Sequence, residues 1–294
     1  MPAQLGDRTV RAASTPVRDG KGTPLHFEKI QKELKNVRCE GVKREFYNSA
    51  SRLDKIMKTK ESRQFGAHVA KYLAKENFDA AYALLAPILA ERTPFRSLDL
   101  IGKEIGAAQM DSVDTFLNHI ALHKTMGGWV VIASALREWI PADMETALAR
   151  VPELAIPADT WYATDIFGER IPGPSLVADF DRALPLLAPW RVHENRWTRR
   201  MVGVAIHFWA KRSRYKAELI PRVPELLDFL EPTFEEWNID AVKGIGWGLK
   251  TLGKYFPEIT APWLAKQKSR RHRAIMMRKA MTYFSDEHRA QVME

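Results

Sequence analysis

The 294-residue sequence lacks most of the residue patterns on which common enzyme chemistries depend. It has a single cysteine, Cys39. One thiol excludes an intramolecular disulfide framework and a cysteine-rich zinc site, and the charged neighbours of Cys39 offer no base for a nucleophile. Glycine-rich phosphate loops, G-x-S-x-G elbows and dinucleotide-binding fingerprints are also missing. The familiar enzyme classes that need these motifs therefore find no support.

Long apolar stretches are missing as well. The longest largely apolar run, "WVVIASAL" at residues 129–136, is far shorter than the roughly 20 residues of a membrane span. The first residues, "MPAQLGDRTVRAASTP", have no apolar core of a secretory signal. We therefore expect a cytoplasmic protein that does not associate with membranes.

Signals for β-structure are equally scarce. No segment alternates apolar and polar residues for long, and no Asn-Gly pair marks a hairpin. From Phe27 onward apolar residues recur every three or four positions, as in "FDAAYALLAPILAE", and prolines separate these runs. The pattern predicts an all-α chain, with residues 1–26 as a flexible basic extension and residues 27–294 as one helical domain.

A weak internal repeat indicates how the helices are arranged. Four segments open with a tryptophan and continue as an amphipathic helix, at intervals of 32, 36 and 40 residues; these are Trp129, Trp161, Trp197 and Trp237. Each interval fits one pair of HEAT-like helices, which predicts an α-solenoid, a curved stack of antiparallel helix pairs with a concave face. Equivalent helices of successive pairs would then bring Asp165, Arg200 and Trp247 into one groove.

The charge distribution points to a polyanionic partner. The net charge is +9, and residues 1–65 carry +7, residues 66–190 carry −6 and residues 191–294 carry +8. In "ENRWTRRMVGVAIHFWAKRSRYK" basic residues surround an apolar helix that carries two tryptophans, a combination that suits phosphates and bases. A buried helix with basic ends explains this one segment about as well.

Two further patterns have ordinary explanations. His119 and His123 have the spacing of a metal pair on a helix, but no third ligand is evident, so we expect two ordinary histidines and no metal. Gly244, Gly246 and Gly248 alternate inside a helical pattern, where each costs roughly 1 kcal/mol relative to alanine. Close packing between neighbouring helices is the common reason for such glycines, and close approach of a ligand to Trp247 is the other.

Three short motifs, in order, resemble the AlkD-like HEAT-repeat DNA glycosylases. "TWYATD" is similar to the family's Trp-x-x-x-Asp, "ENRWTRR" to its (Asp/Glu)-Asn-x-Trp-x-x-Arg, and "KGIGWGLK" to its Lys-x-Ile-Gly-Trp-x-Leu-(Arg/Lys). The resemblance covers about residues 128–280, and Thr160 and Tyr162 depart from some relatives at the rim of the site. The matching positions are Trp161, Asp165, Asn195, Trp197, Arg200 and Trp247.

The resemblance implies a monomeric enzyme that hydrolyses the glycosidic bond of cationic N3- or N7-alkylated purines in duplex DNA, such as 3-methyladenine, 7-methylguanine or bulkier adducts. Asp165 would stabilise the oxocarbenium-like transition state or orient the attacking water. Trp161 and Trp247 would contact the lesion nucleotide through their π faces. No metal or organic cofactor is expected. The DNA backbone would be held by Arg200, Arg199 and Lys243.

Three alternatives remain open at this point. A HEAT-like module can bind DNA without catalysis, and an α-solenoid can bind a protein with the same surface. Asp165 could also serve only as a salt-bridge partner of Arg200. Retention of a carboxylate in a groove that binds a polyanion favours the enzyme over the two binding modules.

Overall fold

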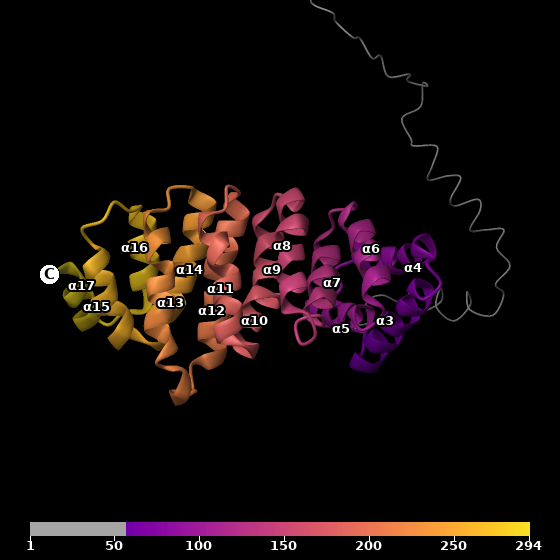
Figure 1. The fold of residues 1–294 in the computed structure, drawn as a ribbon, viewed down its shortest axis with the longest axis horizontal. Coiled ribbons are helices and arrows are strands. Elements are labelled where there is room, and N and C mark those ends of the chain that lie inside the picture. Colours follow the sequence, from indigo (N-terminus) through magenta and orange to yellow (C-terminus); the bar gives the residue numbers. More distant parts are fainter. Residues whose placement is uncertain (1–56) are drawn as a thin grey trace, which may run out of the picture. The chain divides into compact units, whose positions relative to one another are not determined.

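The structure, a computed structural model, describes residues 57–294, in which every regular element is a helix. Within this part of the chain the helices follow one another along a single axis in two layers (Figure 1). The predicted all-α class and repeat-like packing are confirmed. Cys39 and the boundary predicted at residue 26 lie outside the described residues. Among the described helices, none combines the length and apolar character needed to cross a bilayer.

Alternate helices of the chain make up each layer. The first layer, in which each helix packs against the next, consists of α3 (Thr59–Leu73), α5 (Phe95–Gly106), α7 (Met126–Arg137), α9 (Trp161–Arg170), α12 (Arg196–Ser213), α14 (Ile239–Tyr255) and α16 (Ala274–Ala280). The second layer consists of α4 (Phe78–Ala90), α6 (Met110–Ala121), α8 (Met144–Ala158), α11 (Phe180–Leu187), α13 (Arg222–Leu230), α15 (Pro257–Gln267) and α17 (Asp286–Met293). The short α10 (Pro172–Ala178) packs on α12, and 3₁₀ turns follow several helices: η1 (Ala188–Val192), η2 (Ala217–Leu219), η3 (Glu231–Glu235) and η4 (Met281–Tyr283).

Side-chain caps fix where the central helices of the first layer begin. The Asn195 carboxamide accepts the backbone N–H of Trp197 at 2.8 Å, and α12 starts at the next residue after this asparagine. Asn238 caps α14 in the same way, through the N–H of Asp240 at 3.0 Å. An N-terminal asparagine satisfies an amide that the helix itself leaves unpaired. The two caps therefore set the register in which α12 and α14 present their side chains.

Three glycines bring α12 and α14 into backbone contact. A Cβ added at Gly203 would lie 2.2 Å from the carbonyl oxygen of Gly244, and one added at Gly248 would lie 2.7 Å from the carbonyl oxygen of Gly203. A Cβ at Gly244 would lie 2.5 Å from Cγ of Arg200. Close helix packing, the common explanation for the alternating glycines, therefore applies to Gly244 and Gly248.

The four repeating tryptophans have diverged in burial. Trp129 and Trp197 are buried, at 2% and 4% exposure, whereas Trp161 and Trp237 are 60% and 52% exposed. The indole N–H of Trp197 donates to the carboxylate of Asp159 at 2.6 Å, which ties the end of α8 to the start of α12. The repeat in the sequence thus marks helix pairs, but only two of its tryptophans are available to a ligand.

We expect Gly203→Ala to destabilise the protein strongly, because its methyl group would meet backbone atoms of α14 that cannot move independently. Overpacking of this kind costs about 1–3 kcal/mol or more. Gly127→Ala is the matched control, since its Cβ would meet neighbours only at 3.4 Å and alanine is the better helix former. Urea denaturation of both variants checks this, and equal stabilities would contradict the contact described here.

Candidate active site

The Arg200 side chain links three consecutive helices of the first layer, α9, α12 and α14. From α12, Nε and Nη2 of Arg200 donate to the two carboxylate oxygens of Asp165 on α9, each at 2.8 Å. Nη1 of Arg200 donates to the backbone carbonyl of Asp240 on α14 at 2.9 Å. The three residues form a first rung across α9, α12 and α14.

The first rung is largely shielded from solvent. The side chains of Arg200 and Asp165 are 8% and 15% exposed. The ion pair considered from the sequence as an alternative role for Asp165 is therefore present, and it fixes the orientation of the carboxylate. Removing one member of such a pair is costly, because the other charge is left buried without a partner.

A second rung lies further along the same helices. Glu169 follows Asp165 by four residues on α9, and its Oε1 lies 3.7 Å from Nε2 of His207 on α12. The His207 ring stacks on the Trp247 indole, with centroids 4.0 Å apart and planes inclined by 26°. Nδ1 of His207 lies 2.7 Å from the Thr251 hydroxyl, which itself donates to the backbone carbonyl of Trp247 at 2.9 Å. Because that hydroxyl proton is used, Nδ1 of His207 is the donor to Thr251.

Burial disfavours the charged forms of both titratable groups in the second rung, His207 and Glu169. Burial, together with the positive charges of Lys211 and Lys250, lowers the pKa of His207 to about 4. Burial also raises the pKa of Glu169, and the negative charge of Asp165 adds to this shift. At neutral pH a neutral imidazole therefore supports one face of Trp247.

The two tryptophans of the predicted site both reach the surface. Trp161 is the first residue of α9, 60% exposed, with its ring edge-on to Tyr162 at a centroid distance of 6.0 Å. Trp247 is partly exposed beside His207. Asp165 lies one helical turn after Trp161, and α12 connects it through Arg200 and His207 to Trp247. A ligand can therefore approach both indoles, which an enclosed Trp247 would have prevented.

The three predicted backbone-binding residues have different surroundings. Arg199 points away from the rungs and holds Glu236 through Nε and Nη2 at 2.5 and 3.3 Å. Burial raises the pKa of Glu236, but hydrogen bonds from Arg199 and from two backbone amides outweigh this effect, so the pKa is lowered. Lys243 is exposed and forms no ion pair with any described residue. Of Arg199, Arg200 and Lys243, only Lys243 offers a charge that no described carboxylate already binds.

Sequence reasoning missed the second rung. Glu169 and His207 carry no motif of their own, and the available signal was spacing, since they follow Asp165 by four residues and Arg200 by seven. The motif residues Asn195 and Trp197, by contrast, build the start of α12 rather than the exposed site.

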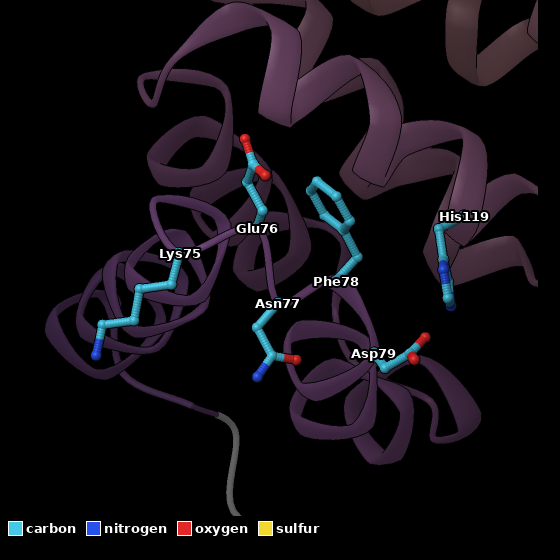
Figure 2. Close-up of a pocket in the computed structure, with 6 residues that line it drawn as sticks. All are labelled: Lys75, Glu76, Asn77, Phe78, Asp79 and His119. Carbon is cyan, nitrogen blue, oxygen red and sulfur yellow. The ribbon is translucent and has the colours of Figure 1, made fainter.

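The histidine pair and a surface cavity lie elsewhere. His119 is on α6 and His123 lies just beyond its end, where the His123 ring stacks on Tyr82 with centroids 3.9 Å apart. A cavity of about 420 Å³ opens at the turn between α3 and α4 (Figure 2); it is lined by Lys75, Glu76, Asn77, Phe78, Asp79 and His119. No predicted site residue lines it. Residues 57–294 bring no three metal-ligating side chains together.

Comparison with known families gives one match. The sequence model of the DNA alkylation repair enzyme family matches residues 130–284, which is more than half of the chain. The chain belongs to this family. The matched part contains both rungs and both exposed site tryptophans, so a role in DNA alkylation repair, with DNA as partner, is supported at the level of the family. No curated protein and no solved structure gave a significant match.

The second rung makes stability sensitive to acid. An unfolded histidine titrates near 6.5 and His207 in the fold near 4, so between these values the unfolded chain binds more protons. The stability contributed by the neutral imidazole is present above 6.5 and is lost as the pH falls toward 4. Between pH 7 and pH 5 we expect wild type to lose about 2 kcal/mol that His207→Phe does not lose.

Urea denaturation of both proteins at the two pH values measures this difference. Phenylalanine keeps the stacking on Trp247, and Glu169, whose raised pKa acts in the opposite sense, is common to both proteins. Equal losses on acidification in wild type and variant would contradict a neutral, buried His207.

Proposed function

We propose that the protein is a DNA glycosylase that excises cationic N3- and N7-alkylated purines from duplex DNA. The observation that carries the proposal is the oriented carboxylate of Asp165, held by Arg200 on the surface that also presents Trp161 and Trp247. Membership of the DNA alkylation repair enzyme family supports it.

The reaction needs little from the protein beyond electrostatics. An alkylated purine cation leaves when the C1′–N bond breaks, and the bonding electron pair neutralises the departing base. The sugar becomes oxocarbenium-like, and water adds to C1′ and releases a proton. Asp165 stabilises the positive charge on the sugar and accepts a hydrogen bond from the attacking water, or its proton. The products are the free base and an abasic site.

Arg200 acts in this proposal through Asp165. Nε and Nη2 of Arg200 hold the carboxylate in one orientation, so it does not have to reorient when the transition state forms. Fixed charges are most effective under this condition. Each oxygen accepts one of these hydrogen bonds and keeps a lone-pair direction for water or sugar. A direct phosphate contact by Arg200, expected from the family resemblance, would have to use its two remaining N–H groups.

The tryptophans would recognise the cationic base through its charge rather than through its shape. A π face attracts a cation by about 0.5–2 kcal/mol, depending on how well water is excluded. Trp161 is open to solvent on the α9 side, and Trp247 is backed by the uncharged ring of His207. Two such faces on an open surface accept a methyl group or a bulky adduct alike.

We expect Asp165→Asn to slow base release on the order of 10²-fold or more, because the shape of the side chain remains while its charge is lost. The measurement is the single-turnover release of base from duplex DNA containing N7-methylguanine. Because Asp165 is paired with the buried Arg200, we also expect a loss of about 1–3 kcal/mol in stability.

Asp99→Asn is the matched control for this substitution. Asp99 on α5 accepts Nε and Nη2 of Arg170 at 2.7 and 3.3 Å, so the same atoms change in another ion pair of the first layer. This variant should lose stability but keep the wild-type excision rate. Excision at the wild-type rate by Asp165→Asn would reject the catalytic assignment.

Trp161→Ala should reduce excision by about 2- to 30-fold, the range that corresponds to one cation–π contact. Trp161→Phe keeps a π face and should recover part of the loss. Because Trp161 is exposed, both variants should remain within about 0.5 kcal/mol of wild-type stability. Equal excision by the alanine variant and wild type, with N3-methyladenine as well as N7-methylguanine, would remove Trp161 from the site.

A further inference from the structure

Glu169 and His207 face each other as two hydrogen-bond acceptors. Oε1 of Glu169 lies 3.7 Å from Nε2 of His207, which is too long for a hydrogen bond. Because Nδ1 of His207 carries the proton that is donated to Thr251, Nε2 of the neutral ring has only a lone pair. A proton on Glu169 is therefore what would join the two groups.

Glu169 shares a helix face with the carboxylate of the proposed reaction. Trp161, Asp165 and Glu169 follow one another at steps of four residues on α9, so they lie in one row. Neighbouring members of such a row have Cβ atoms about 5–6 Å apart. The charge of Asp165 is one of the influences that raise the pKa of Glu169, as expected for two carboxyl groups on one side of a helix.

The two carboxyl groups differ in what a proton would cost them. Both oxygens of Asp165 accept hydrogen bonds from Arg200, and protonation of Asp165 would leave this buried guanidinium without its counter-charge. Glu169 binds no arginine or lysine among the described residues, and its side chain is 37% exposed, against 15% for Asp165. Water can therefore reach Glu169 more easily, and protonation there breaks no ion pair with a cation.

The charges around Glu169 suit a proton acceptor. Burial raises its pKa, which makes its carboxylate a stronger base than a fully solvated one. The positive charges of Arg170, Lys211 and Arg212 oppose this shift without cancelling it. The ionised form is thus kept accessible near neutral pH by three cations, none of which is hydrogen-bonded to the carboxylate.

We propose that Glu169 is the general base of the reaction and takes the proton of the attacking water. The inference rests on the proposed function and divides its chemistry between two carboxylates, since Asp165 keeps its charge and stabilises the sugar. The departing base takes the electron pair of the C1′–N bond. The water oxygen supplies the pair of the new C1′–O bond, one of its O–H bonds breaks with the electrons left on oxygen, and the proton moves to Glu169.

The second rung can hold the transferred proton. Protonated Glu169 is a donor, and a movement of about 1 Å would bring it within hydrogen-bonding distance of Nε2 of His207. His207 acts as a positioning residue, because its hydrogen bond to Thr251 and its stacking on Trp247 fix the ring. The acceptor pair is thus completed only after water has lost its proton, which favours the forward step.

Glu169→Gln tests the assignment, because its amide can donate to Nε2 of His207 but cannot take up a proton. The measurement is the single-turnover release of base from duplex DNA containing N7-methylguanine, between pH 5 and pH 7. A departed base can return to C1′ unless water adds, so we expect release at pH 7 to slow on the order of 10²-fold, the lower end of general-base contributions. The wild-type rate should fall toward pH 5, as Glu169 becomes protonated, and the rate of the variant should not.

Sodium azide gives a readout that a purely structural role would not change. Azide is a nucleophile with no proton to lose, so its addition to C1′ needs no base. Compared with the same concentration of NaCl, it should restore base release by Glu169→Gln toward the wild-type rate and leave an azido sugar in the DNA. It should not restore Asp165→Asn, which lacks the stabilising charge.

Glu104→Gln is the matched control. Glu104 lies on α5 in the first layer, where its side chain is 26% exposed and bound to Arg63 at 3.0 Å, so the same atoms and the same net charge change. Its rate and pH profile should equal those of wild type. Excision at the wild-type rate by Glu169→Gln, or a slow variant that azide does not rescue, would overturn the assignment of Glu169 alone. A wild-type protein that releases no base would reject the glycosylase proposal itself.

Discussion

The guanidinium of Arg200 holds the candidate site together. It is nearly enclosed, it joins α9 to α14 through α12, and it fixes the carboxylate that stabilises the transition state in the proposed chemistry. A buried ion pair of this kind contributes little net stability compared with an apolar contact. It does fix the relative orientation of its two side chains, and removing either of them is strongly destabilising. The closeness of α12 and α14 at their glycines is what brings the guanidinium within reach of the α14 backbone.

Charge is separated between the two rungs. In the first rung a guanidinium and a carboxylate form a bidentate pair, whereas in the second the burial of His207 and Glu169 disfavours their charged forms. The surface near Trp247 therefore combines a paired carboxylate, an uncharged imidazole and three lysines that form no ion pair with a described residue, Lys243, Lys250 and Lys279. A cationic base and a polyanionic backbone need different electrostatic surroundings, and here these surroundings lie side by side on α9, α12, α14 and α16.

Much of the fold followed from the sequence because its signals are local. Three- and four-residue periodicity, the prolines between the apolar runs and the spacing of the tryptophans each depend on neighbouring residues, and they predicted helices in repeating pairs. The motif positions Trp161, Asp165, Arg200 and Trp247 could also be singled out. Their roles within the structure could not, since pairing and burial depend on contacts between helices about 35 to 40 residues apart in the chain.

Arg199 and His207 illustrate that limit. The last two arginines of the "ENRWTRR" motif were expected to face DNA, yet one helical step of about 100° turns Arg199 toward Glu236 and Arg200 toward Asp165. His207 had no motif, and only its stacking on Trp247 reveals its place. The neighbouring helix decides whether a basic side chain contacts a carboxylate or solvent. A local sequence motif does not specify which residues of that helix it will face.

The division of the helices into two layers has a consequence for how the protein could be altered. Both rungs and both tryptophans of the candidate site lie on α9, α12 or α14, and each helix packs mainly on its immediate neighbours. In such modular architectures stability is close to a sum of local terms. The helix pairs at the α3 end are therefore separable from the chemistry, and this end of the stack is where pairs could be exchanged or added to extend the footprint while the reacting groups stay in place.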